Sequence, residues 1–143
     1  MRYSKLTNRL ISEGGDAWSI HTRAGELKAA GEDVILLSVG DPDFDTPAPI
    51  VDTAVKSLSG GRTHYTPAGG IDELRIAAAQ YHRRLTGQPA GPENVVIVPG
   101  AQCGLFCAAM CLLEPGDNIL VPEPMYVTYE SVVRASGAEI IPI

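Results

Sequence analysis

The hydrophobic and polar positions follow their clearest pattern from residue 94 to residue 143. Two short runs there, residues 95–98 (VVIV) and 119–121 (ILV), are continuously apolar, which is typical of strands buried on both faces. Between and after them come longer segments of helical length. The pattern predicts strands at 95–98, 118–121 and 139–143 and helices at 102–113 and 125–136. This alternation predicts right-handed βαβ crossovers and a parallel sheet.

Upstream of residue 94, helices are predicted at residues 16–30, 46–58 and 72–85, with glycines or prolines at their ends. Residues 34–39 (VILLSV) read as one more strand. The fold class is therefore α/β, with a parallel-rich sheet flanked by helices. Because three parallel strands leave an apolar edge open, we expect an incomplete sheet and an N-terminal portion of a longer protein.

Composition and charge exclude several kinds of partner. The formal net charge is −6, and no cluster of basic residues exceeds the pair Arg83 and Arg84. A nucleic-acid or anionic-membrane partner is therefore not expected. The N-terminus lacks the apolar stretch of a signal peptide, and Pro99 and Gly100 interrupt the longest nearly uncharged segment. We expect a cytoplasmic protein.

The turn at Gly100, Ala101 and Gln102 is the first candidate site. It lies between a predicted strand and a predicted helix, where unpaired backbone N–H groups and the helix dipole favour an anion such as phosphate. Gln102 could add a side-chain hydrogen bond. The alternative is an ordinary strand-to-helix turn. The segment matches neither the dinucleotide-binding nor the ATP-binding glycine pattern.

Tyr126 follows the predicted strand at 118–121, at the edge where open α/β sheets bind ligands. Its ring could stack on a planar cofactor. The alternative is an aromatic side chain that packs on the neighbouring loop, and position alone favours it. Tyr129, one turn further along, is expected in the core.

Other residues that often carry chemistry have plainer interpretations. Cys103, Cys107 and Cys111 form one stripe of a helix and are expected to be buried, with a reactive Cys103 as the alternative. No metal site is expected, because prolines stiffen the loop that carries three aspartates and no closing glutamate follows. These are Asp41, Asp43 and Asp45, interpreted as turn and capping residues. His21, His64 and His82 are interpreted as surface or supporting residues.

Six ordered segments together resemble the N-terminal part of the fold-type I pyridoxal-phosphate (PLP) aminotransferases of the aspartate aminotransferase superfamily. They cover almost the whole chain, and their order and spacing are more specific than any one of them. They are residues 40–47 (GDPDFDTP), Tyr65 with Gly70, 71–75 (IDELR), 100–102 (GAQ), 115–117 (PGD) and 124–129 (PMYVTY).

The resemblance implies roles for six residues. Ala101 and Gln102, after Gly100, would hold the PLP phosphate, and Tyr126 would stack on the pyridine ring. Tyr65 would reach the phosphate of the other subunit's cofactor, which implies a homodimer with shared active sites. Gly40 would meet the substrate carboxylate, where a side chain would fill the space.

The resemblance also shows what these 143 residues lack. The family's Schiff-base lysine lies in a later segment, and Lys5, Lys28 and Lys56 do not fall in its motif. They are interpreted as surface residues. No catalytic residue is therefore assigned, and the chain alone is expected not to transaminate.

The expected parent activity is transfer of an amino group from an L-amino acid to a 2-oxo acid, with arginine and pyruvate as the specific expectation. Residues 1–45 would form an N-terminal arm and small-domain segment, and residues 46–143 would begin the large PLP-binding domain. The alternatives are another type I PLP enzyme, such as a C–S lyase or decarboxylase, and a non-catalytic truncated product or interaction module.

Overall fold

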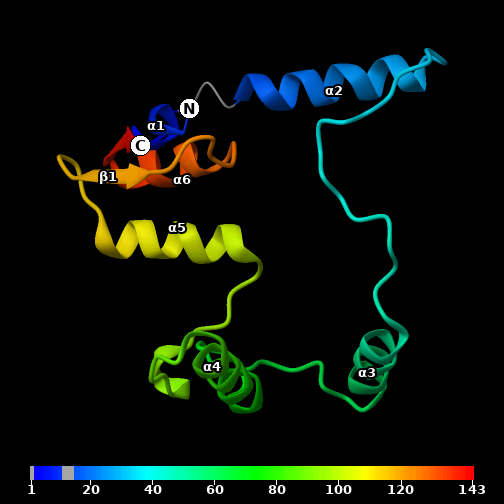
Figure 1. Ribbon diagram of the computed structural model, residues 1–143, viewed down its shortest axis with the longest axis vertical. Helices are drawn as coiled ribbons and strands as arrows, with labels where there is room; N and C mark the ends of the chain where they lie inside the picture. Colours follow the sequence, from blue (N-terminus) through cyan, green and yellow to red (C-terminus); the bar gives the residue numbers. More distant parts are fainter. Residues whose placement is uncertain (1, 11–14) are drawn as a thin grey trace. The chain divides into compact units, whose positions relative to one another are not determined.

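The computed structural model describes residues 2–10 and 15–143, except the side chains of residues 15–17 (Figure 1). The chain divides into two compact units. The first contains Met1–Asp41 and Pro99–Ile143, and the second contains Pro42–Val98. Each unit is described by itself.

The first unit is built around a strand–helix–strand motif. Strand β1 (Asn118–Val121) is followed by helix α6 (Tyr129–Ser136) and strand β2 (Glu139–Pro142). The two strands are parallel, with Asn118 opposite Glu139 and Val121 opposite Pro142. The ladder extends beyond β1, because the Glu123 N–H donates to the Ile143 carbonyl at 2.9 Å. That bond fixes the start of the loop that leads to α6.

The core of this unit is small and lies where α6 meets the strands and helix α5 (Ala101–Leu112). Apart from Ser136, its buried residues are all valine or alanine. The Ser136 hydroxyl is satisfied, since it donates to the Val133 carbonyl at 2.7 Å. The buried apolar residues are Ala109, Val121, Val132, Val133, Ala135 and Ala138.

Two further helices belong to the first unit: α1 (Leu6–Arg9) and α2 (Gly15–Ala29). The extended segment after α2 leads to Gly40. Helix α2 thus agrees with the helix predicted at 16–30. No helix in the described part of the chain is long and apolar enough to cross a membrane.

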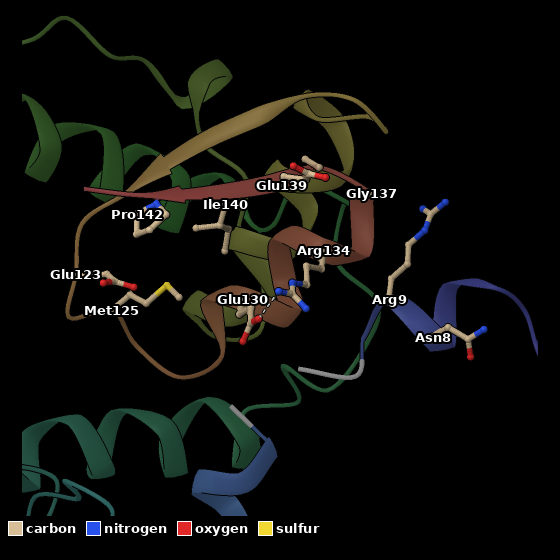
Figure 2. Close-up of a pocket in the computed structure, with 11 residues that line it drawn as sticks. Asn8, Arg9, Glu123, Met125, Glu130, Arg134, Gly137, Glu139, Ile140 and Pro142 are labelled. Carbon is tan, nitrogen blue, oxygen red and sulfur yellow. Dashed lines mark ion pairs between the residues drawn. The ribbon is translucent and has the colours of Figure 1, made fainter. Parts of the chain in front are cut away.

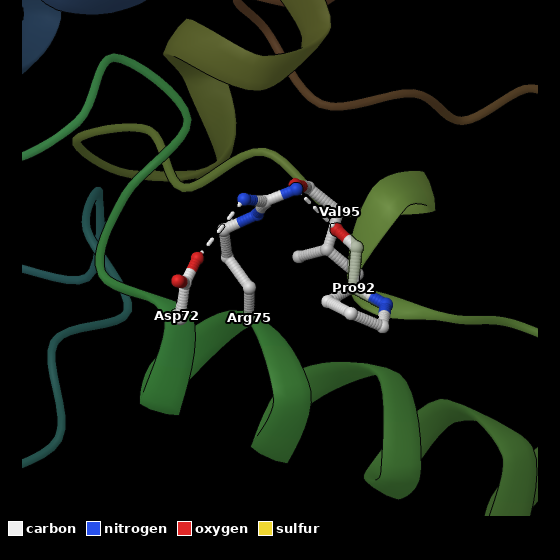
Figure 3. Close-up of polar contacts among 4 residues, drawn as sticks. All are labelled: Asp72, Arg75, Pro92 and Val95. Carbon is white, nitrogen blue, oxygen red and sulfur yellow. Dashed lines mark hydrogen bonds and ion pairs between the residues drawn. The ribbon is translucent and has the colours of Figure 1, made fainter.

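The second unit contains helix α3 (Ala48–Ser59), helix α4 (Asp72–Thr86) and a short 3₁₀ turn, η1 (Pro92–Asn94). Arg75 connects α4 to η1 and to Val95 (Figure 3). Its Nε donates to the Val95 carbonyl at 3.0 Å, its Nη2 to the Pro92 carbonyl at 2.6 Å, and its Nη1 to Asp72 at 3.3 Å. One guanidinium therefore ties the start of α4 to the segment that follows η1.

The strands predicted at 118–121 and 139–143 are confirmed, with β2 ending at Pro142, and they pair in parallel as expected. The strands predicted at 34–39 and 95–98 are wrong, because neither segment pairs with a neighbouring strand in the described residues. In the second of them the Ile97 N–H donates to the Gly69 carbonyl, and the Val95 carbonyl accepts from Arg75. Its backbone groups are thus used by a loop and a side chain instead of a ladder.

The helix predicted at 125–136 begins later, at Tyr129. Residues 122–128 form a turn in which the Tyr129 N–H donates to the Tyr126 carbonyl at 2.9 Å. Tyr126 therefore lies on a loop after β1, which is the place that an open α/β sheet offers to a ligand.

Candidate functional site

The N-terminus of α5 has no side-chain cap, which leaves backbone donors that suit an anion. Gly100 precedes the helix with φ 82° and ψ 157°, and no side chain caps the helix there. The first N–H with an intrahelical partner is that of Gly104, which donates to the Gly100 carbonyl. The N–H groups of the first turn are therefore left for another partner, and the helix dipole favours a negative one.

The side chain of Gln102 is held by Thr128. The Thr128 hydroxyl donates to Oε1 of Gln102 at 2.7 Å, across 26 positions of sequence. Thr128 is the residue just before α6, so this bond joins the starts of two helices. With Oε1 engaged, the two N–H groups of the Gln102 amide are left as donors.

Tyr126 keeps most of its ring accessible. Its side chain is 57% exposed, and its ring meets that of Tyr129 edge-on, with the centroids 5.8 Å apart and the planes at 62°. The ring therefore packs on a neighbour and still offers surface for stacking. Tyr129 is itself at the surface, so its predicted place in the core is wrong.

A cavity of about 140 Å³ brings Tyr126 together with Gly40. Both were candidate site residues, although 86 positions separate them in the sequence. A Cβ added to Gly40 would meet nothing within 4 Å, so the space in front of its backbone is open. The other lining residues are Trp18, His21, Ser38, Val39 and Val127.

The sequence analysis marked none of these five lining residues as a site residue. His21 Nδ1 lies 2.7 Å from the Ser38 hydroxyl, and the Trp18 ring meets the His21 ring edge-on at 6.0 Å. His21 was interpreted as a surface or supporting residue, and it contributes to the cavity wall. Ser38 could have been found by its place two residues before Gly40, whereas no sequence signal marks Trp18.

Tyr65 and the lysines are not part of this arrangement. Tyr65 belongs to the second unit, where its side chain is fully exposed on the segment between α3 and α4. Lys5, Lys28 and Lys56 are exposed, as expected, and none lines the cavity. The sequence assigned no catalytic residue, and the cavity adds no lysine to change that.

The cysteines of α5 are more accessible than predicted. Cys103 is half-buried, whereas Cys107 and Cys111 are exposed, so the expectation of buried packing is wrong for these two. A hydrogen bond with Cys103 raises the pKa of the Cys107 thiol above its usual value, and partial desolvation adds to this. Within the described residues, no three histidine, cysteine or acidic side chains are grouped so that they could hold a metal.

Two other cavities lie in the first unit. One, of about 530 Å³, is lined by residues of both charges, including the ion pair of Arg134 with Glu130 at 2.7 Å (Figure 2). The other, of about 290 Å³, is an apolar groove between α5, β1 and α6. Neither contains a residue that the sequence marked as a candidate for cofactor or substrate binding.

Comparison with known proteins identifies the family of this chain. The profile of the family described as aminotransferase class I and II matches residues 32–143. The chain is 52% identical over its whole length to the arginine–pyruvate transaminase of Pseudomonas aeruginosa, of which it spans 36%. It is 38% identical over 121 residues to the aspartate aminotransferase of Bacillus subtilis. The match covers 85% of this chain and 31% of that protein.

Solved structures give the same answer. The aspartate aminotransferase of Thermus thermophilus with maleate matches 99% of this chain and 37% of its own with a TM-score of 0.89 and 34% identity. That of Rhizobium meliloti matches all of this chain and 35% of its own with a TM-score of 0.89 and 30% identity. The chain thus has part of the type I aminotransferase α/β fold and spans about a third of the length of these relatives. It belongs to the aminotransferase class I and II family.

Proposed function

We propose that this chain supplies the phosphate-binding and ring-stacking part of a PLP-dependent aminotransferase. The observation that carries the proposal is the start of α5, where an uncapped helix follows Gly100 and the Gln102 amide is fixed by Thr128. The site fits a phosphate, because it combines free backbone N–H groups with a side-chain donor. Tyr126, two residues before Thr128, offers a ring for the planar part of the cofactor.

In this proposal the residues of this chain bind and orient the cofactor and the substrate. The cofactor supplies the electron-withdrawing ring system that makes amino-group transfer possible. The backbone N–H groups of Ala101 and Gln102 hold the phosphate. Tyr126 limits the tilt of the ring. Gly40, in the same cavity as Tyr126, leaves room for the substrate carboxylate.

The proposed substrates are an L-amino acid and a 2-oxo acid. Arginine with pyruvate is the specific pair that we propose, and the 52% identity to the Pseudomonas aeruginosa transaminase supports it. The substrates are distinguished by assays of the complete protein with a panel of amino acids. Release of ammonia or carbon dioxide would instead favour a lyase or a decarboxylase.

We also propose that the lysine that binds the cofactor lies outside these 143 residues. Lys5, Lys28 and Lys56 are exposed, and none of them borders the cavity that contains Gly40 and Tyr126. No group in that cavity can then bind the cofactor as a lysine amine does. This chain alone is therefore expected to bind PLP without transaminating.

A homodimer is the proposed assembly. Its support is Tyr65, whose side chain is fully exposed. Tyr65 matches the tyrosine that reaches the neighbouring subunit in the PLP aminotransferases that the sequence resembles. The division into an arm at residues 1–45 and a large domain from residue 46 stays a prediction, as does the cytoplasmic location.

The proposal is tested by titrating this chain with PLP and, separately, with pyridoxal, which lacks the phosphate. Absorbance reports binding, and borohydride reduction followed by peptide mapping locates any imine. We expect PLP to bind more tightly than pyridoxal, with scattered or no lysine labelling. Equal affinities would contradict the phosphate site. Saturable labelling of one lysine would contradict the proposal that the essential lysine lies elsewhere.

A further inference from the structure

Thr128 breaks the usual pattern for a threonine at the start of a helix. At that position the hydroxyl commonly accepts a hydrogen bond from the first turn of its own helix. Thr128 directly precedes α6, but its hydroxyl makes no such bond. The hydroxyl donates instead to Gln102 Oε1, on another helix. A local rule that is broken where a ligand is expected points to a functional role for the residue.

We infer that Thr128 is a positioning residue that fixes the Gln102 amide with its N–H groups toward the anion at the start of α5. The inference rests on the proposed function, because it takes that anion to be the PLP phosphate. It adds a residue that does not touch the phosphate and acts through one that does.

The argument begins with the two orientations of a glutamine amide. The terminal torsion of a glutamine is broad and roughly two-fold, so an exposed amide can present either its oxygen or its nitrogen to a neighbour. Toward a phosphate the amide oxygen and the amide nitrogen have opposite effects. The nitrogen donates hydrogen bonds, whereas the oxygen places lone pairs against a negative charge. Something must select between them if Gln102 is to stabilise an anion.

The Thr128 hydroxyl contributes to that selection by occupying the amide oxygen. At 2.7 Å from Oε1 it is at the usual distance for a hydroxyl donor and an oxygen acceptor. The amide oxygen is thereby turned toward α6, and the nitrogen is left on the other branch of the amide. After a rotation by half a turn the hydroxyl would accept from the amide nitrogen instead, but the amide oxygen would then face the anion, so with an anion bound the hydroxyl and the anion together favour the orientation seen here.

Thr128 is itself held in place. Its carbonyl accepts from the Val132 N–H at 3.2 Å and from the Ser131 hydroxyl at 3.0 Å. Val132 and Val133 are among the most buried residues of the first unit. The hydroxyl is thus attached to the best-packed helix of that unit, so it can act as a fixed point for the more exposed Gln102.

The test uses this chain with Thr128→Val, which keeps the shape and removes the hydroxyl, and with Thr128→Ser, which keeps the hydroxyl. Dissociation constants are measured for PLP and for pyridoxal. We expect Thr128→Val to weaken PLP binding about three- to tenfold, the usual effect of one hydrogen bond, and to leave pyridoxal binding unchanged. Thr128→Ser should stay within about twofold of the unaltered chain.

A double substitution tests whether Thr128 acts through Gln102. Once Gln102→Ala has removed the amide, adding Thr128→Val should change the PLP dissociation constant no further. A full additional loss in the double variant would overturn the inference. So would a phosphate preference that survives Thr128→Val undiminished.

A measurement without ligand separates this inference from the proposed function. The side-chain ¹⁵NH₂ resonances of Gln102 should shift and sharpen toward those of a freely rotating amide in Thr128→Val, and in Thr128→Ser they should not. Unchanged resonances would overturn the inference whatever PLP does. If the resonances change but the unaltered chain binds PLP and pyridoxal equally, the phosphate site falls, and with it the positioning role.

Discussion

Gly100 has a backbone conformation that only glycine adopts readily. Its φ of 82° and ψ of 157° lie in the region that a Cβ atom makes unfavourable. A Cβ there would meet nothing within 4 Å, so any cost of adding one is conformational and not a clash. The small residue is thus required by the direction in which the chain enters α5.

We therefore expect Gly100→Ala to lower the free energy of unfolding by about 1–3 kcal/mol and to weaken PLP binding, because relaxation of the strain turns the first N–H groups of α5. Urea unfolding and a PLP titration measure the two effects. Gly25→Ala is the matched control, since Gly25 lies inside α2, has no atom near its added Cβ and needs no positive φ.

The control should be neutral or stabilise the chain by up to about 1 kcal/mol, since alanine is a better helix former than glycine. Gly100→Ala with unchanged stability and unchanged PLP affinity would show that the turn does not need its glycine. Loss of PLP affinity in Gly25→Ala as well would show that the binding assay reports general damage.

At this scale the sequence marked candidate residues whose expected roles depend on their own backbone or ring. Gly40 and Tyr126 line one cavity and Gly100 precedes α5, and the binding roles of all three stay predictions. Thr128 and Trp18 were missed, because Thr128 bonds Gln102 26 positions away and Trp18 shares its cavity with Gly40 and Tyr126, which are distant in the sequence. Spacing along the chain carries no information about such a neighbour.

At the scale of elements, the helices were easier to predict than the strands. A helix makes its hydrogen bonds within itself, so α4 and α5 form nearly where their sequence patterns place them. A strand needs a partner, and residues 95–98 have none among the described residues although the run is as apolar as β1. Hydrophobicity predicts that a segment is extended more reliably than it predicts pairing.

The segment at 95–98 is held instead by hydrogen bonds from Arg75, so a substitution of Arg75 tests what stabilises it. Arg75→Lys keeps the charge but loses the planar group that reaches two carbonyls and Asp72. Its side chain is only 23% exposed. We expect a loss of about 2 kcal/mol in the free energy of unfolding of the second unit and faster hydrogen exchange at the Ile97 amide.

Arg62→Lys serves as the control in the same unit. The Arg62 side chain is 65% exposed and pairs with Glu73 at 3.5 Å, so this change should cost less than about 0.5 kcal/mol. Equal effects of the two substitutions would mean that Arg75 contributes only as a surface charge.

At the scale of the whole molecule, the chain leaves much apolar surface uncovered. Helix α5 has no charged residue, and several of its large side chains are exposed. A helix that is hydrophobic on all sides is normally covered on all sides.

We expect this chain to bind the dye ANS, and Leu112→Gln to reduce the dye fluorescence. Leu112 is 79% exposed and borders the apolar groove, so replacing it removes accessible apolar surface without opening a cavity. The melting temperature of the Leu112→Gln variant should differ from that of the unaltered chain by less than about 3 °C, as for a surface substitution.

Ala109→Gln is the matched control on the same helix. Ala109 is buried, and a longer polar side chain there should cost about 1–3 kcal/mol through overpacking. If Leu112→Gln unfolds the chain as readily as Ala109→Gln, then Leu112 is not at the surface.

The bond between Thr128 and Gln102 has a consequence for how this sequence can change over generations. A mutation of Gln102 to a residue without a side-chain oxygen leaves the Thr128 hydroxyl without its acceptor, and selection on position 128 is then relaxed. After a mutation of Thr128 to an apolar residue, a positively charged side chain at position 102 is favoured, because a cation attracts an anion without a neighbour that sets its orientation. Positions 102 and 128 should therefore co-vary among related sequences, although they are 26 positions apart.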